Sequence, residues 1–139
     1  MRFTIFEITI GWPLELYVVK EEIKKRTKQI GLDVIKLIDI LPSKISSRAI
    51  ANQLIRCSTS IGANYRAACR AKSGADFINK LKIVEEETDE TIYWLEILEE
   101  SGLIKSEETE RLKRESNEIL SIVVASINTI RNKANCKES

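Results

Sequence analysis

The chain has 139 residues, of which 43% are hydrophobic and 31% are charged, and its formal net charge is +1. This composition is typical of one soluble globular domain and argues against an intrinsically disordered chain. No apolar run approaches the roughly 20 residues that a membrane-spanning helix needs, so we expect no association with a membrane.

Positive and negative charges are divided unevenly between the two halves of the chain. Residues 1–73 contain 13 Lys and Arg against 6 Asp and Glu, which gives +7. Residues 74–139 contain 9 against 15, which gives −6. Such an asymmetry indicates either a polar-faced molecule or copies that associate through complementary surfaces.

The first 20 residues differ in composition from the rest of the chain. They are apolar and partly aromatic, but Glu7 interrupts them and residues 11–13, Gly-Trp-Pro, form a break. Only Arg2 supplies a basic start and no small-residue cleavage site follows, which argues against a signal peptide. We expect residues 1–20 to be a strand-like or loosely attached extension outside the main domain.

Apolar residues recur every three to four positions in four segments, which predicts four amphipathic helices. The first is predicted over residues 21–41 and ends there because Leu41, which precedes a proline, avoids the helical region. The second is predicted to extend to about Ala71. Its N-cap candidates are Ser43, Ser46 and Ser47.

The third helix is predicted to begin at Ser73, which has an acid three residues later, as in a capping box. It is predicted to end at residues 101–102, Ser-Gly, a common helix C-cap. The fourth begins at Ser106, whose next two residues are acids that suit the positive end of a helix dipole. It is predicted to continue through Ile130 and to give way to a polar tail over residues 133–139.

Four long helices with short connections predict an all-α fold, an antiparallel up-and-down four-helix bundle over residues 21–132. The third and fourth helices carry more apolar residues than a core stripe of roughly 100° requires. This surplus indicates either an interface between copies of the chain or a wide core. The candidate interface residues are Tyr93, Trp94, Ile97, Leu120 and Val124.

The second predicted helix carries a stripe of arginines, and residues 45–74 contain no acidic residue. At about 100° per residue, Arg48 and Arg66 superpose, Arg70 lies roughly 40° away and Arg56 roughly 80° away. The apolar residues of this helix cluster on the opposite side. A stripe of arginines without counter-charges is typical of phosphate recognition.

We predict a nucleic-acid-binding surface made of these four arginines and further basic residues at the helix end and on the first helix: Lys72, Lys24, Lys25, Arg26 and Lys28. The one aromatic residue near the stripe, Tyr65, falls on the core side. We therefore expect recognition of the backbone or shape of structured RNA and no base stacking. The alternative is a solvated face, or ion pairs with the acidic third helix through Glu86 and Glu90.

We predict no catalytic, cofactor-binding or metal-binding residues, and therefore no enzyme. A di-iron site in a bundle needs Glu-x-x-His on two helices, and the chain has no histidine. The acids at residues 85–90 leave a carboxylate-only magnesium site as a minor alternative. Without histidine, no Ser or Cys has its usual activating base. The spacing of Cys57, Cys69 and Cys136 suggests no disulfide framework, which fits a reducing cytoplasm.

Two features inside the second helix predict packing. Residues 60–63, Ser-Ile-Gly-Ala, are small enough to allow a close approach of another helix. Asn64 falls near the core edge, where its amide needs partners. We expect Asn64 to fix the register between helices.

The stretch from Gln53 to Leu98 resembles a family of four-helix bundle proteins first noticed as open reading frames in intervening sequences of 23S ribosomal RNA genes. Accessory proteins of diversity-generating retroelements look like distant relatives. The resemblance extends from Glu21 to about Asn132, and Ala67 replaces the usual Glu. The matching residues are Leu54-Ile55-Arg56, Ser60-Ile61-Gly62-Ala63-Asn64-Tyr65-Arg66, Arg70-Ala71-Lys72-Ser73, Asp76-Phe77-Ile78, Lys80-Leu81, Glu86, Glu90 and Tyr93-Trp94-Leu95.

The resemblance implies a bundle that assembles as a ring, expected to be a pentamer, in the bacterial cytoplasm. It also implies association with structured RNA or with a nucleic-acid enzyme. We accordingly predict a non-enzymatic homo-oligomer that binds structured RNA through the basic face of the second helix. The alternative is a homo-oligomeric scaffold whose basic and acidic faces meet between copies, without nucleic-acid binding.

Overall fold

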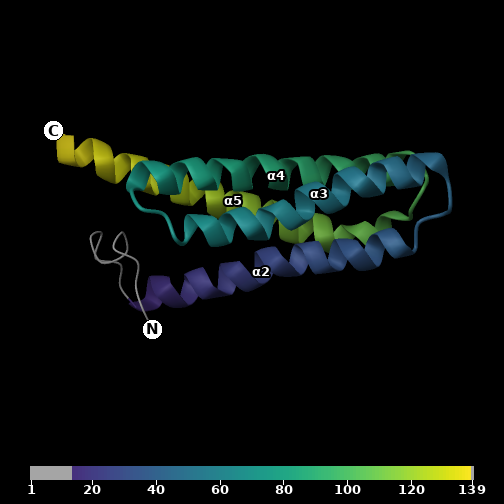
Figure 1. Cartoon of the computed structure of the whole chain (residues 1–139), viewed down its shortest axis with the longest axis horizontal. Coiled ribbons are helices and arrows are strands. Elements are labelled where there is room, and N and C mark those ends of the chain that lie inside the picture. The colour runs from purple at the N-terminus through teal and green to yellow at the C-terminus, as the bar shows by residue number, and fades with distance from the viewer. Residues whose placement is uncertain (1–13, 139) are drawn as a thin grey trace.

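The computed structural model describes residues 14–138, which form four helices: α2 (Leu14–Asp39), α3 (Ile45–Ala68), α4 (Gly74–Glu100) and α5 (Ser106–Glu138). Each helix runs antiparallel to the next (Figure 1), and α3 packs on both α2 and α4. Helix α5 packs on α4 and meets α2 more sparsely. This arrangement confirms the predicted all-α, up-and-down four-helix bundle. None of the helices described is long and apolar enough to span a membrane.

The core is formed by the apolar stripes of all four helices, as the periodicity predicts. Its fully buried members include Val34, Leu54, Val84 and Ile119. Burial of each such side chain stabilises the fold by about 1.5–3 kcal/mol relative to exposure. The bundle is therefore held mainly by the predicted stripes.

Two helices are longer than predicted. Helix α2 begins at Leu14, so a strand-like structure is wrong for residues 14–20, while residues 1–13 lie outside the described part. Helix α5 continues through the predicted polar tail to Glu138 and projects past the other helices (Figure 1). The Lys, Ala and Glu of that tail are good helix formers, which outweighs the loss of apolar residues.

Most of the helix ends follow the local signals, and α5 begins at Ser106 as predicted. Ser73 caps α4, because its Oγ accepts a hydrogen bond from the Asp76 amide at 3.1 Å. Gly102 follows α4 with φ of 74°, a left-handed conformation that glycine adopts without strain. The predicted serine cap of α3 is wrong: its N-cap is Lys44, which makes no side-chain cap bond.

Helices α2 and α3 approach each other closely at two glycines. A Cβ on Gly62 would lie 3.2 Å from both the Cα and the amide nitrogen of Lys28. A Cβ on Gly31 would lie 3.3 Å from the methyl group of Thr59. The close packing predicted for residues 60–63 is therefore confirmed, and its contact is backbone against backbone.

Asn64 does not fix the register between helices. Its Nδ2 donates to the carbonyl oxygen of Ser60 at 2.9 Å and to the Ser60 Oγ at 2.8 Å. Both partners belong to α3, so the prediction of an interhelical role is wrong. A partner one turn away satisfies the amide more simply than a neighbouring helix does.

Candidate nucleic-acid interface

Three of the four stripe arginines remain exposed and unpaired. Arg48, Arg66 and Arg70 are exposed, and none of them forms an ion pair with any residue in the described range. Lys72 is also exposed, although the Asp76 carboxylate, which accepts from its backbone N–H at 3.2 Å, lies nearby. The guanidinium groups of this subset are therefore available to an external anion.

Arg56, the fourth stripe arginine, is tied to α4. Its Nη1 lies 3.3 Å from a Glu87 oxygen, and its Nη2 donates to Glu90. The hydrogen bond from Arg56 holds the pKa of Glu90 below its ordinary value. Trp94 donates to the same Glu90 oxygen at 3.2 Å. The predicted alternative, ion pairs with the acidic helix, is therefore confirmed for Arg56 and Glu90. The second partner of Arg56 is Glu87 and not the expected Glu86.

Arg26 likewise differs from its basic neighbours on α2, because it is paired with carboxylates of α5. Its Nε donates to Glu115 at 2.6 Å, and its Nη2 donates to the other Glu115 oxygen at 3.0 Å. The same Nη2 lies 2.8 Å from Glu118. These bonds, led by the one to Glu115, raise the pKa of Arg26. The side chain therefore joins α2 to α5, where the two helices pack sparsely.

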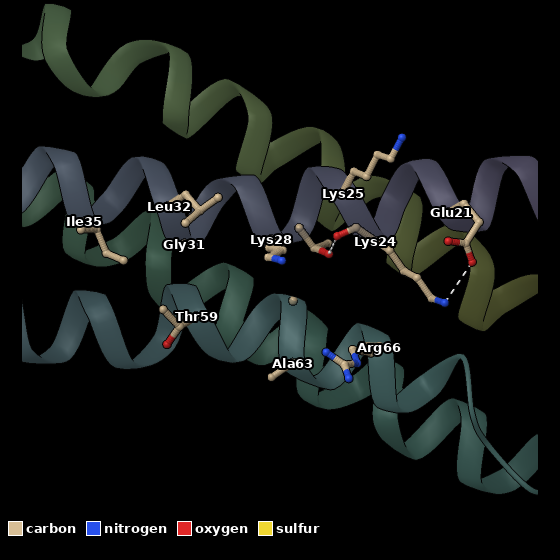
Figure 2. A pocket seen from close by; sticks show the side chains of 12 residues that line it. Glu21, Lys24, Lys25, Lys28, Gly31, Leu32, Ile35, Thr59, Ala63 and Arg66 are labelled. Atoms are coloured by element: carbon tan, nitrogen blue, oxygen red, sulfur yellow. Dashed lines mark hydrogen bonds and ion pairs between the residues drawn. The ribbon is translucent and has the colours of Figure 1, made fainter.

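The remaining basic residues of α2 meet α3 at a groove of about 400 Å³, which we call the α2–α3 groove. Lys24, Lys25 and Lys28 line it from α2, and Arg66 lines it from α3 (Figure 2). One carboxylate, Glu21, also lines the groove and accepts a hydrogen bond from the Lys24 Nζ at 2.9 Å. Four basic and one acidic side chain give the groove a net charge of +3.

The structure adds two apolar residues that the prediction of the surface omits. Leu32 and Ile35 line the same groove, and they are 43% and 40% exposed. Both lie outside the core positions Ile30, Val34 and Leu37 of α2. The sequence contains a signal for this second face. Two apolar residues three positions apart, outside a complete core stripe, indicate a further contact surface on the helix.

The predicted apolar interface residues separate into exposed and partly buried members. Tyr93 is 52% exposed and packs edge to face on Trp94, with ring centroids 5.2 Å apart. Trp94 itself packs against the core, while Ile97, Leu120 and Val124 are partly buried. Within its described residues, α5 has no exposed large apolar side chain. Tyr93 is therefore the member of the set that best suits contact with another molecule.

Tyr65 packs against the core, as predicted, and burial raises the pKa of its hydroxyl. Burial also raises the pKa of the Cys57 and Cys69 thiols, which disfavours the nucleophilic thiolate. Within the described residues, no three His, Cys, Asp or Glu side chains gather as a metal site.

Comparisons with known proteins agree with this architecture. The sequence profile of the 23S rRNA-intervening sequence protein family matches residues 20–125. The chain is also similar to a crystallised protein of unknown function from the S23 ribosomal protein family of Bacteroides thetaiotaomicron VPI-5482. That similarity has a TM-score of 0.73 and 35% sequence identity, and it covers 78% of this chain and 97% of the other. The comparison with curated proteins found no match. The chain therefore belongs to the 23S rRNA-intervening sequence protein family.

Proposed function

We propose that this protein is a non-enzymatic homo-oligomer that binds structured RNA through the basic side chains around the α2–α3 groove. The observation that carries the proposal is that Lys24, Lys25, Lys28 and Arg66 line one groove, which has a single carboxylate among its lining residues. Arg70, which is exposed in the turn that follows α3, adds a further cation four residues after Arg66. Clustered cations of this kind supply most of the affinity of proteins for nucleic-acid backbones.

The chemistry of the cations suits phosphate. The planar guanidinium of Arg66 can donate two parallel hydrogen bonds to one phosphate, whereas the lysines act as mobile point charges. Double-stranded RNA is recognised largely through its shape, 2′-hydroxyls and phosphates, which a basic surface without exposed aromatics can contact. The similar crystallised protein is described as a member of the S23 ribosomal protein family, which favours RNA among the polyanions.

Oligomerisation would strengthen such a site. Each copy carries a modest +3 at its groove, and copies arranged around an axis would add their fields. The exposed Tyr93 is the candidate anchor between copies, since aromatic residues are enriched in interfaces.

The proposal is tested by fluorescence anisotropy with a labelled RNA hairpin at several salt concentrations. Wild-type protein is expected to bind with an affinity that falls steeply with salt, and the K28E/R66E double variant is expected to bind at least tenfold more weakly. R114E is the matched control, because Arg114 is exposed on α5 and forms no ion pair within the described residues. Salt-independent binding, or an equal loss in R114E, would contradict the proposal.

The scaffold alternative rests on the uneven division of charge, +7 in residues 1–73 against −6 in residues 74–139, which suits association through complementary surfaces. If the groove cations serve contacts between copies, K28E/R66E should dissociate the oligomer in light scattering. In that case the wild-type protein should show no RNA affinity at low salt.

A further inference from the structure

The α2–α3 groove has two chemically different ends. Lys24 and Arg66 lie at one end, whereas Leu32, Ile35 and Thr59 lie at the other (Figure 2). We propose that this groove receives one unpaired nucleotide of the bound RNA, with its phosphate at the basic end and its base on the apolar end. The inference rests on the proposed function and specifies which RNA element the site takes.

The basic end is arranged for a phosphate group. Lys28 lies beside Gly62, and Arg66 lies one turn further along α3. Lys24 lies one turn before Lys28 on α2 and also lines the groove, where its Nζ donates to Glu21. Lys28 and Arg66 thus supply cations from two facing helices, and a phosphate at this end can accept bonds from both.

The apolar end is arranged for a flat, uncharged group. The Thr59 hydroxyl donates to the Ile55 carbonyl at 2.6 Å, and its methyl group faces Gly31. Thr59 therefore contributes a methyl surface beside Leu32 and Ile35. These last two side chains are 43% and 40% exposed, which is high for large apolar residues.

The dimensions of the groove suit one nucleotide. Its volume of about 400 Å³ lies within the range of roughly 300–1,000 Å³ for small-ligand sites. Lys28 and Leu32 are separated by about 6 Å along the helix axis, which is the scale of a phosphate and its base. A base pair inside a duplex cannot enter such a space, whereas bases of bulges and loops can leave the stack.

A docked protein helix fits the groove less well. A helix that packs lengthwise on α2 needs apolar residues at every turn of the contact face. Moving from Ile35 and Leu32 toward the N-terminus of α2, the next positions of this face are Lys28, Lys25 and Glu21. The apolar contact therefore ends after about one turn, which is enough for a base but short for a helix.

The test compares three RNA hairpins of one sequence: one with a single bulged adenosine, one with an abasic bulge and one without a bulge. Anisotropy titration of the full chain is expected to show about fivefold tighter binding of the adenosine bulge, less than stacking on an aromatic ring would give. The L32S/I35S variant is expected to lose this preference and to bind all three hairpins equally. I45S is the matched control, because Ile45 is an exposed apolar residue outside the groove, and it should keep the preference.

Each outcome is decisive. Equal, salt-dependent binding of all three hairpins by the wild-type protein overturns this inference and leaves the proposed function intact. No binding of any hairpin overturns both. A preference that survives in L32S/I35S also overturns the inference. Dissociation of an oligomer by L32S/I35S in light scattering would show that a second copy occupies the groove, which overturns it as well.

Discussion

Gly62 in α3 and Lys28 in α2 approach so closely that a Cβ on Gly62 would lie 3.2 Å from the Cα of Lys28. This contact sets the spacing of the two helices at the α2–α3 groove. It also brings the Lys28 side chain and Arg66, one turn beyond Gly62, to the same groove. A packing feature therefore determines how the candidate RNA-binding cations are placed.

We expect G62A to lower the free energy of unfolding by about 1–3 kcal/mol, the usual range for overpacking. The added methyl group would lie 3.2 Å from backbone atoms of Lys28, which cannot rotate away. This cost exceeds the gain of about 1 kcal/mol that alanine brings to a helix. Urea unfolding measures the difference.

G31A is the matched control for that substitution. Its nearest neighbour is the methyl group of Thr59 at 3.3 Å, a side-chain atom that can shift. We expect a smaller destabilisation than for G62A, and equal losses in the two variants would contradict this account.

Arg26 is expected to contribute to stability and not to RNA affinity. R26Q leaves Glu115 without its two hydrogen bonds from Arg26 and weakens the sparse contact of α2 with α5. Bonds to charged groups contribute about 1.5–3 kcal/mol when buried, so we expect a loss of about 1–2 kcal/mol at this partly exposed site. Urea unfolding measures the loss of stability, and RNA titration of the folded variant checks that the affinity is unchanged. Weakened RNA binding at unchanged stability would contradict it.

The Arg56–Glu90 pair makes stability depend on pH. The pKa of Glu90 is lower in the folded chain, chiefly because of the hydrogen bond from Arg56. Its stabilising effect is therefore present above the ordinary glutamate pKa of 4.5 and is lost as the pH falls through the lower folded value. R56Q should be less stable than the wild type at pH 7, and this difference should shrink in acid.

Unfolding curves of wild type and R56Q at pH 7 and at pH 3 measure that difference. R48Q is the control, because Arg48 is exposed and forms no ion pair within the described residues. A difference between wild type and R56Q that stays constant with pH would contradict the assignment.

Lys28 is expected to contact one phosphate. K28A should weaken binding of every RNA by a similar factor and reduce the slope of log affinity against log salt by about one. R114A should leave the slope unchanged. A sequence-dependent loss in K28A would indicate that Lys28 contacts bases instead.

Thiol chemistry tests the burial of the cysteines. Cys57 and Cys69 are buried, and burial raises the pKa of both, whereas Cys136 is exposed. Titration with a thiol reagent should modify Cys136 rapidly in the folded protein and the other two after addition of urea. Rapid modification of all three without urea would contradict the core packing.

The bundle was predictable because its signals are local. The apolar period identifies the four helices, and the Ser73 cap needs a partner only three residues away. The ion-pair partners of individual cations were not predictable from local signals. Arg26 and Lys25 are adjacent, yet within the described residues Arg26 bonds Glu115, 89 residues away on α5, whereas Lys25 forms no ion pair. Such pairings depend on how the helices cross, and the periodicity of the sequence does not determine that geometry.

Only part of the candidate site was predictable, because its composition also depends on how the helices pack. The basic stripe identified Arg66 and the lysines of α2, but it also included Arg56, which meets acids of α4. Leu32 and Ile35 were missed because a pattern of basic residues does not include apolar side chains. A second apolar face beside a complete core stripe would have identified them.

The end of α5 extends past its neighbours, and residues 131–137 are exposed (Figure 1). Short helical turns without tertiary packing are marginal in water, so these turns should open and close independently of the rest. Their amide protons should exchange with deuterium well before those near Val123. Truncation after Ile130 should accordingly leave the thermal midpoint unchanged, which makes this end a suitable place to attach a label.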